Sequence, residues 1–259
     1  MQIACCQLDT VWEDKPASHA RVTRLLDEAK VEAGGLVVLS EFFATGFSLD
    51  VPAVIEDDRR ESETYLADTA RRYGVFVVGG VVNAGADGKG RNELVAFDPS
   101  GQLLARYCKL HPFSYARETE YYEPGERLVS FQWQGVRVAP FICYDLRFPE
   151  VFRAVTRRGA ELIIVIANWP KPRREHWMAL LRARAIENQA YVAAVNRCGS
   201  DPNLEYAGDS RIIDPQGNII ADAGDRECVI KGELDVEAMT SYRQSFPALR
   251  DMRDEFFVE

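Results

Sequence analysis

Glu41, Lys109 and Cys143 each stand at the end of a predicted strand, a place where a folded protein can use a polar side chain for chemistry. A cysteine becomes a nucleophile when its thiol loses a proton, and a positioned carboxylate can accept that proton. A fixed lysine ammonium can stabilise the oxyanion that forms during acyl transfer. Taken singly, the three have ordinary explanations: a buried inert thiol, a solvated glutamate and an exposed lysine. Together they are candidates for covalent catalysis by a cysteine.

The base that would activate Cys143 is not an obvious histidine. The chain has three histidines, His19, His111 and His176, and none stands in a Cys–His–Asn arrangement. The sequence therefore favours a carboxylate or a lysine as the base. Three scattered histidines without paired ligand spacing also predict that the protein has no metal site and needs no cofactor.

Alternating strands and helices must position these side chains. Glu41 is expected to lie beyond the carboxyl end of a buried strand, where ligands bind in open α/β sheets. Cys143 is expected at a turn between a strand and a helix. The pattern predicts strands at 3–9, 36–41, 75–82, 136–143, 162–168 and 191–196, and helices at 16–33, 59–73, 149–158 and 174–189.

A loose internal repeat supports a layered α/β fold. Each half of the chain has a strand–helix–strand portion followed by a predicted hairpin, and each hairpin carries an Asp-Pro-x-Gly turn, at 98–101 and at 214–217. No linker rich in proline, glycine or serine divides the chain, so we expect a single domain over 1–259. The charged tail at 236–259, with Tyr242, Phe246, Phe256 and Phe257, is either an arm that packs on a partner subunit or a partly ordered terminus.

Composition excludes several classes of protein. The 259 residues carry a formal net charge of −9 and no basic stripe, which argues against binding to nucleic acid or to an anionic membrane. Six scattered cysteines without a CxxC pair are typical of a reducing compartment. No apolar run approaches the length of a membrane helix, and the first residues lack the pattern of a signal peptide. These features predict a soluble cytoplasmic protein.

Three segments in order resemble the nitrilase superfamily of carbon–nitrogen hydrolases. They are Leu-Ser-Glu41-Phe-Phe-Ala-Thr-Gly-Phe, Tyr-Cys-Lys109-Leu-His-Pro-Phe and Ile-Cys143-Tyr-Asp-Leu-Arg-Phe-Pro-Glu. The likeness continues through Ala-Asn168-Trp169-Pro and Gly208-Asp209-Ser-Arg-Ile-Ile-Asp-Pro, and it spans 1 to about 234.

The resemblance implies a four-layer αββα sandwich with pseudo-twofold halves and a Glu-Lys-Cys triad of Glu41, Lys109 and Cys143. In such an enzyme Glu41 takes the thiol proton, the thiolate attacks an amide carbonyl, and Lys109 with the backbone N–H of Tyr144 stabilises the oxyanion. The family also has a second glutamate after the lysine. Spacing favours Glu118 over Glu120 for this role.

The Cys143 segment, together with Asn-Trp-Pro, most resembles the omega-amidase branch, which hydrolyses 2-oxoglutaramate or 2-oxosuccinamate to the dicarboxylate and ammonia. An arginine or lysine would then meet the far carboxylate of a dicarboxylate monoamide. The candidates for contact with substrate are Phe42, Tyr115, Tyr144, Arg147, Asn168, Trp169, Lys171, Arg173 and Arg174. Alternatives are another amide, an N-carbamoyl compound or a nitrile as substrate, or a catalytically idle binding module. The resemblance also implies a homodimer or higher homo-oligomer, with the C-terminal arm at its interface.

Overall fold

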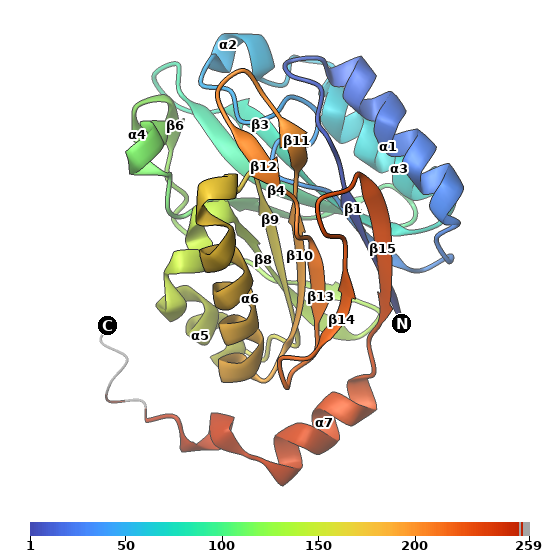
Figure 1. Ribbon diagram of the computed structural model, residues 1–259, viewed down its shortest axis with the longest axis vertical. Helices are drawn as coiled ribbons and strands as arrows, with labels where there is room; N and C mark the ends of the chain where they lie inside the picture. The colour runs from blue at the N-terminus through green and yellow to red at the C-terminus, as the bar shows by residue number, and fades with distance from the viewer. Residues whose placement is uncertain (254, 256–259) are drawn as a thin grey trace.

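Two stacked β-sheets form the centre of the computed structural model, which describes residues 1–253 and 255 (Figure 1). The first sheet has the order β15-β1-β2-β3-β4-β5, and a short strand β6 pairs with β4. Strands β1, β2 and β3 are parallel, and β4, β5 and β15 add antiparallel pairs. The bounds are β1 Gln2–Gln7, β2 Leu36–Val38, β3 Phe76–Ala84, β4 Gly90–Phe97, β5 Leu103–Cys108, β6 Tyr122–Glu123 and β15 Cys228–Glu233.

The second sheet repeats this plan. Its order is β14-β13-β10-β9-β8-β7, with β8, β9 and β10 parallel and the other pairs antiparallel. Each sheet thus has three parallel strands, then a hairpin on one side and one antiparallel strand on the other. The bounds are β7 Phe131–Trp133, β8 Val136–Ile142, β9 Leu162–Ala167, β10 Tyr191–Asn196, β13 Arg211–Ile213 and β14 Ile219–Asp222.

Two helices cover the outer face of each sheet, α1 and α3 on the first and α5 and α6 on the second (Figure 1). Their bounds are α1 Lys15–Ala29, α3 Glu61–Tyr73, α5 Pro149–Arg157 and α6 Arg174–Asn188. Local signals set their ends: the Asp14 carboxylate caps α1, Gly74 ends α3 in the left-handed conformation, and Pro149 opens α5. Apolar side chains fill the space between the sheets and between helices and sheets, which confirms the predicted αββα sandwich with pseudo-twofold halves.

Several short elements were not predicted. They are α2 Val51–Val54, α4 Glu118–Tyr121, the hairpin of β11 Cys198–Ser200 and β12 Glu205–Ala207, and the 3₁₀ turns Ser114–Ala116, Cys143–Arg147, Lys171–Arg173 and Ala248–Asp251. Strands β7 and β15, at the end of each parallel set, were missed as well. The predicted strands at 36–41 and 136–143 also end sooner than expected, so Glu41 and Cys143 lie in the turns that follow them.

The tail begins as helix α7 (Val236–Ser245), which extends along the outside of the sandwich (Figure 1). Met239 is its one fully buried side chain, and Arg243 donates to the backbone carbonyls of Gln189 and Ala160. The rest of the tail includes residues 254 and 256–259, which carry Phe256 and Phe257 and lie outside the described residues. Among the described helices, none is long and apolar enough to cross a membrane.

Candidate active site

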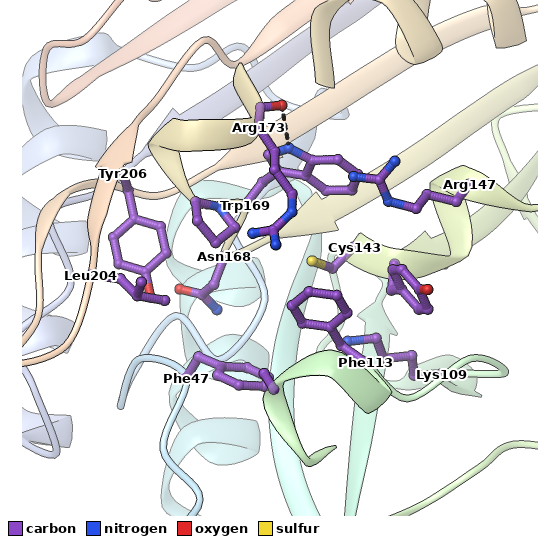
Figure 2. Close-up of a pocket in the computed structure, with 13 residues that line it drawn as sticks. Phe47, Lys109, Phe113, Cys143, Arg147, Asn168, Trp169, Arg173, Leu204 and Tyr206 are labelled. Atoms are coloured by element: carbon purple, nitrogen blue, oxygen red, sulfur yellow. Dashed lines mark hydrogen bonds between the residues drawn. The ribbon is translucent and has the colours of Figure 1, made fainter. Parts of the chain in front are cut away.

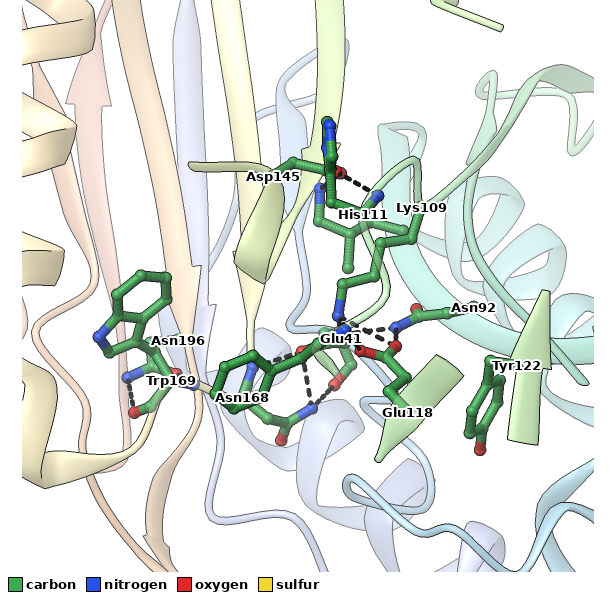
Figure 3. Close-up of polar contacts among 12 residues, drawn as sticks. Glu41, Asn92, Lys109, His111, Glu118, Tyr122, Asp145, Asn168, Trp169 and Asn196 are labelled. Atoms are coloured by element: carbon green, nitrogen blue, oxygen red, sulfur yellow. Dashed lines mark hydrogen bonds and ion pairs between the residues drawn. The ribbon is translucent and has the colours of Figure 1, made fainter. Parts of the chain in front are cut away.

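Glu41 lies at the carboxyl end of β2 and is completely buried. Its Oε1 accepts hydrogen bonds from Lys109 Nζ at 3.0 Å and from Asn92 Nδ2 at 2.7 Å, and its Oε2 accepts one from the backbone N–H of Asn168 at 2.7 Å. The neighbouring strand β3 approaches so closely that a Cβ on Gly80 would stand 2.7 Å from the Glu41 Cα. The carboxylate is therefore held firmly from several sides (Figure 3).

Lys109 follows β5 and carries a buried ammonium between two carboxylates. Its Nζ lies 3.0 Å from Glu41 Oε1 and 2.8 Å from Glu118 Oε2. Burial by itself disfavours the charge, but Glu118 and Glu41 together hold the pKa of Lys109 well above its usual value. The side chain is thus a fixed cation at neutral pH.

The structure distinguishes the two candidates for the second glutamate. Glu118, the first residue of α4, is fully buried, accepts from Lys109 and Asn92, and has its pKa raised mainly by burial. Glu120 is exposed and pairs with Arg117 on the surface. Only Glu118 joins the cluster of Glu41 and Lys109.

Cys143 occupies a sharp turn that presents its thiol from the end of β8. Its φ of 48° is a left-handed conformation that a side chain adopts only when its surroundings enforce it. The thiol is nearly buried, and burial, with the Glu41 carboxylate as the next cause, raises its pKa well above the usual value. The resting thiol therefore keeps its proton, and attack requires a base.

A second buried carboxylate, Asp145, ties the cysteine turn to the segment after Lys109. Its Oδ1 accepts from the backbone N–H of His111 at 3.0 Å and pairs with His111 Nδ1 at 2.8 Å. Its Oδ2 accepts from the Tyr107 hydroxyl at 2.7 Å and from the backbone N–H of Ile142 at 3.0 Å. The sequence offered Asp145 only as a polar neighbour of Cys143, and it gave His111 no partner.

A small pocket reaches Cys143 and Lys109 (Figure 2). Of the predicted contact residues, Tyr144, Arg147, Asn168, Trp169 and Arg173 line it. The lining residues that sequence reasoning missed are Phe47, Phe113, Ala116, Pro170, Leu204 and Tyr206.

Four predicted contact residues are not in the pocket wall: the aromatic Phe42 and Tyr115, and the basic Lys171 and Arg174. Phe42 is buried behind the site, where its ring stacks on Tyr122 at 5.5 Å. Tyr115 is 78% exposed and packs against the Arg173 guanidinium, 4.8 Å from its ring centre. Phe42 follows Glu41 in the sequence, and Tyr115 precedes Ala116, which lines the pocket. In both cases the local turn of the backbone directs the ring away from Cys143.

The basic residues near the pocket divide into paired and unpaired groups. Lys171 forms an ion pair with Glu205, and Arg174 binds Asp209 through two nitrogens. Arg147 and Arg173 have no carboxylate within ion-pair distance among the described residues. Arg147 instead lies over the Trp169 ring at 4.8 Å, and Arg173 lies over aromatic rings on the opposite wall. The pocket therefore presents two guanidinium groups available to an anionic ligand.

The described residues contain no group of three or more His, Cys, Asp or Glu side chains arranged to hold a metal ion. The sandwich fold and a buried Glu-Lys-Cys cluster at its strand ends define a class of hydrolase. The family model described as carbon-nitrogen hydrolase matches residues 2–244, and the chain belongs to this family.

Relatives within the family cover nearly the whole chain. It is 36% identical to the 2-oxoglutaramate amidase of Bacillus subtilis (strain 168), with 98% of each chain covered. It is 39% identical to omega-amidase YafV of Escherichia coli (strain K12), over 99% of this chain and 98% of the other. Among solved structures it resembles XC1258 from Xanthomonas campestris, a CN-hydrolase superfamily protein with an arsenic adduct in its active site. The TM-score is 0.90 at 35% identity, covering 98% of this chain and 97% of the other.

Proposed function

We propose that the protein is an omega-amidase that hydrolyses the terminal amide of a small dicarboxylate monoamide, such as 2-oxoglutaramate or 2-oxosuccinamate. The observation that carries the proposal is one pocket that joins the Cys143 thiol and Lys109 to the unpaired guanidinium groups of Arg147 and Arg173. The relatives named 2-oxoglutaramate amidase and omega-amidase, which match over almost the full chain, support this choice of substrate.

The first half of the reaction forms a thioester. Glu41 takes the thiol proton while the sulfur of Cys143 bonds to the amide carbon, and the carbonyl oxygen becomes an oxyanion. Lys109 and the backbone N–H of Tyr144 stabilise that charge. The C–N bond then breaks, and the nitrogen leaves as ammonia with the proton from Glu41.

The second half hydrolyses the thioester with the same groups. Glu41 takes a proton from water, the hydroxide oxygen bonds to the acyl carbon, and the C–S bond breaks. The carboxylic product departs, and the proton returns to the sulfur of Cys143. Glu118 keeps Lys109 in place throughout, because its two oxygens lie 3.0 and 2.8 Å from the Lys109 ammonium.

The far end of the substrate meets positive charge and flat apolar surfaces. In this proposal Arg147 binds the free carboxylate, with its guanidinium held by the Trp169 ring and by a contact of Nη2 with His176 Nδ1 at 3.2 Å. Phe113 and Tyr206 form apolar walls that suit a short carbon chain. A net charge of −9 makes such local cations necessary for an anionic substrate.

An ammonia-release screen tests the proposal with 2-oxoglutaramate, 2-oxosuccinamate, glutamine, asparagine, a simple nitrile and an N-carbamoyl amino acid. We expect release from the two oxo-acid amides and its loss in Cys143→Ala. Cys108→Ser, which changes a half-buried thiol outside this pocket, serves as the matched control and should keep the activity. If the enzyme prefers the nitrile or the carbamoyl compound, the proposed substrate class is wrong. Activity in Cys143→Ala would refute the mechanism.

The same proposal includes a single domain over 1–259, a cytoplasmic location and a homodimer in which the arm at 236–259 reaches the interface. The position of α7 along the outside of the sandwich, with one fully buried side chain, supports the last point. Sedimentation of the full chain and of a chain ending at residue 235 tests it. A monomer for the full chain, or an unchanged dimer after truncation, would contradict the role of the arm.

A further inference from the structure

Asn92, near the start of β4, connects the two carboxylates of the site. Its side chain is buried, and its Nδ2 donates to Glu41 Oε1 at 2.7 Å and to Glu118 Oε1 at 2.9 Å (Figure 3). One NH₂ group thus supplies a donor to each carboxylate. The opposite orientation of the amide would place its oxygen against two anions, so only this orientation fits the site.

The two oxygens of Glu41 differ in their free capacity. Oε1 accepts from Asn92 and from Lys109, which fills its two lone-pair positions. Oε2 accepts from the Asn168 backbone N–H at 2.7 Å, while the Asn168 side-chain amide reaches it only at 3.4 Å because that amide donates to the Glu41 carbonyl at 2.7 Å. Oε2 therefore has room for a proton.

Asn168 connects Glu41 to the pocket. Its backbone N–H donates to Oε2, and Asn168 lines the same pocket as Cys143. Because Oε1 is already filled, we expect a proton that leaves the thiol to bond to Oε2.

We propose that Asn92 is a positioning residue that directs the thiol proton to Oε2 of Glu41. Asn92 donates to Oε1 of Glu41 and to Oε1 of Glu118 at the same time. Both of these oxygens are then occupied, and the thiol proton is directed to Oε2 of Glu41. In this step the S–H bond of Cys143 breaks and an O–H bond forms on Oε2, and the proton later leaves with ammonia. The transfer of this proton from Glu41 to ammonia rests on the proposed function.

The Asn92 side chain is bound through its donors alone. Its Oδ1 is buried and has no hydrogen-bond partner among the described residues, whereas its Nδ2 donates to both carboxylates. The titratable groups around Glu41 are Lys109, Glu118, Cys143, Tyr122 and Tyr206.

Asn83 offers a matched control in the same sheet. Its Nδ2 donates to Glu63 at 2.9 Å and to Glu93 at 2.7 Å, and Arg106 bonds to both carboxylates. Like the Asn92 cluster, this cluster has one amide between two buried carboxylates, but it has a second cation, Arg60, which bonds to Glu63 and donates to Asn83 Oδ1 at 3.2 Å. It lies on β3 and outside the pocket of Cys143, so it measures what such a cluster contributes to folding alone.

The experiment compares Asn92→Ala with Asn83→Ala in the full-length enzyme. Turnover is measured against substrate concentration and pH, and alkylation of Cys143 by iodoacetamide is followed across pH by mass spectrometry. Loss of a donor to the carboxylate disfavours its charged form, so in Asn92→Ala the acid limb of both profiles should move to higher pH. We expect kcat to fall about 10²-fold, the loss associated with a misplaced catalytic group, with KM unchanged. Asn83→Ala should lose thermal stability and keep both profiles.

Wild-type kcat and profiles in Asn92→Ala would overturn the inference, as would equal losses in Asn83→Ala. If Asn92→Ala does not fold, Asn92→Ser is measured in its place, with the same expectations. Alkylation needs no substrate and therefore separates the two proposals. A shifted alkylation profile in an enzyme that releases no ammonia from any amide would support Asn92 and refute the proposed function.

Discussion

Replacing Lys109 with methionine tests the electrostatic design of the site most directly. The Lys109 ammonium is buried between Glu41 and Glu118, with 2.8–3.0 Å separating it from their oxygens. Methionine has a similar length and no charge. Lys109→Met therefore leaves two buried carboxylates next to each other, with Asn92 as a shared donor but no cation.

The expected cost follows from this geometry. Removing one partner of a buried ion pair costs about 3–5 kcal/mol, because it leaves an uncompensated buried charge. For a chain of this size, about 2–4 °C of Tm accompanies each kcal/mol, so Tm should fall by about 6–20 °C near pH 8. Ammonia release should fall at least about 10²-fold, since Lys109 is the proposed oxyanion cation.

The sign of the pH dependence is the sharper test. Burial already raises the pKa of Glu118, and loss of Lys109 raises it further in the folded state. A carboxyl group whose pKa is higher when folded than when unfolded stabilises the fold at low pH, and this contribution disappears as pH rises through the folded pKa. The variant should therefore lose less stability at pH 5 than at pH 8.

Urea denaturation of both proteins at pH 5 and pH 8 measures this difference. The double variant Lys109→Met/Glu118→Gln removes one anion along with the cation, so it should recover part of the lost stability at pH 8. It should recover little at pH 5, where the single variant has already bound a proton. Equal losses at the two pH values, or no recovery in the double variant, would show that the cluster is not held together by these charges.

Three further changes have defined outcomes. Glu118→Gln should lower kcat about 10²-fold, while Glu120→Gln, on the surface, should keep the wild-type rate. Equal rates of ammonia release in the two variants would count against the choice of Glu118. The amide of Asp145→Asn has one oxygen and can satisfy at most two of the four hydrogen-bond donors that surround the Asp145 carboxylate. The variant should therefore have a lower kcat and a lower urea midpoint. An unaffected kcat would contradict a role for Asp145 in holding the Cys143 turn. Burial, followed by the charge of Lys15, lowers the pKa of His19 to about 4, so the native fold should lose up to about 3 kcal/mol as pH falls from about 6.5 to 4. Urea titrations of His19→Gln should show that the free energy of unfolding depends less on pH in that range. An unchanged pH dependence would refute the assignment of this effect to His19.

The pattern of residues predicted a layered α/β fold and marked Glu41 and Cys143 for one physical reason, while the resemblance to the family implied the four-layer sandwich. A buried parallel strand needs a continuous apolar run, and such a run is visible in a sequence. Glu41 and Cys143 stand out at the ends of two such runs, whereas Lys109 follows the antiparallel strand β5, which is half exposed and contains Arg106. Because all three strands end at the same edge of the stacked sheets, the structure brings the three side chains together.

Other members of the site carry no such signal. Asn92 lies inside a strand between Arg91 and Glu93, where nothing in the sequence marks which face it uses. Spacing favours Glu118 over Glu120, but only the folded chain gives the physical reason, because the short helix α4 buries the first and exposes the second. Phe42 was misplaced for the same reason: it follows Glu41 in the sequence, but its backbone has a positive φ of 46° and its ring points away from the pocket.

The duplicated plan of the fold also explains how the Glu41 carboxylate is oriented. In the first sheet Glu41 follows β2, the middle one of three parallel strands, and in the second sheet Asn168 follows β9, which holds the corresponding place. The two residues bond to each other, since Asn168 donates its backbone N–H to Glu41 Oε2 and its side-chain amide to the Glu41 carbonyl. The pseudo-twofold relation of the sheets thus brings equivalent strand ends into contact. The Asn168 amides in one half thereby fix the orientation of the Glu41 carboxylate in the other.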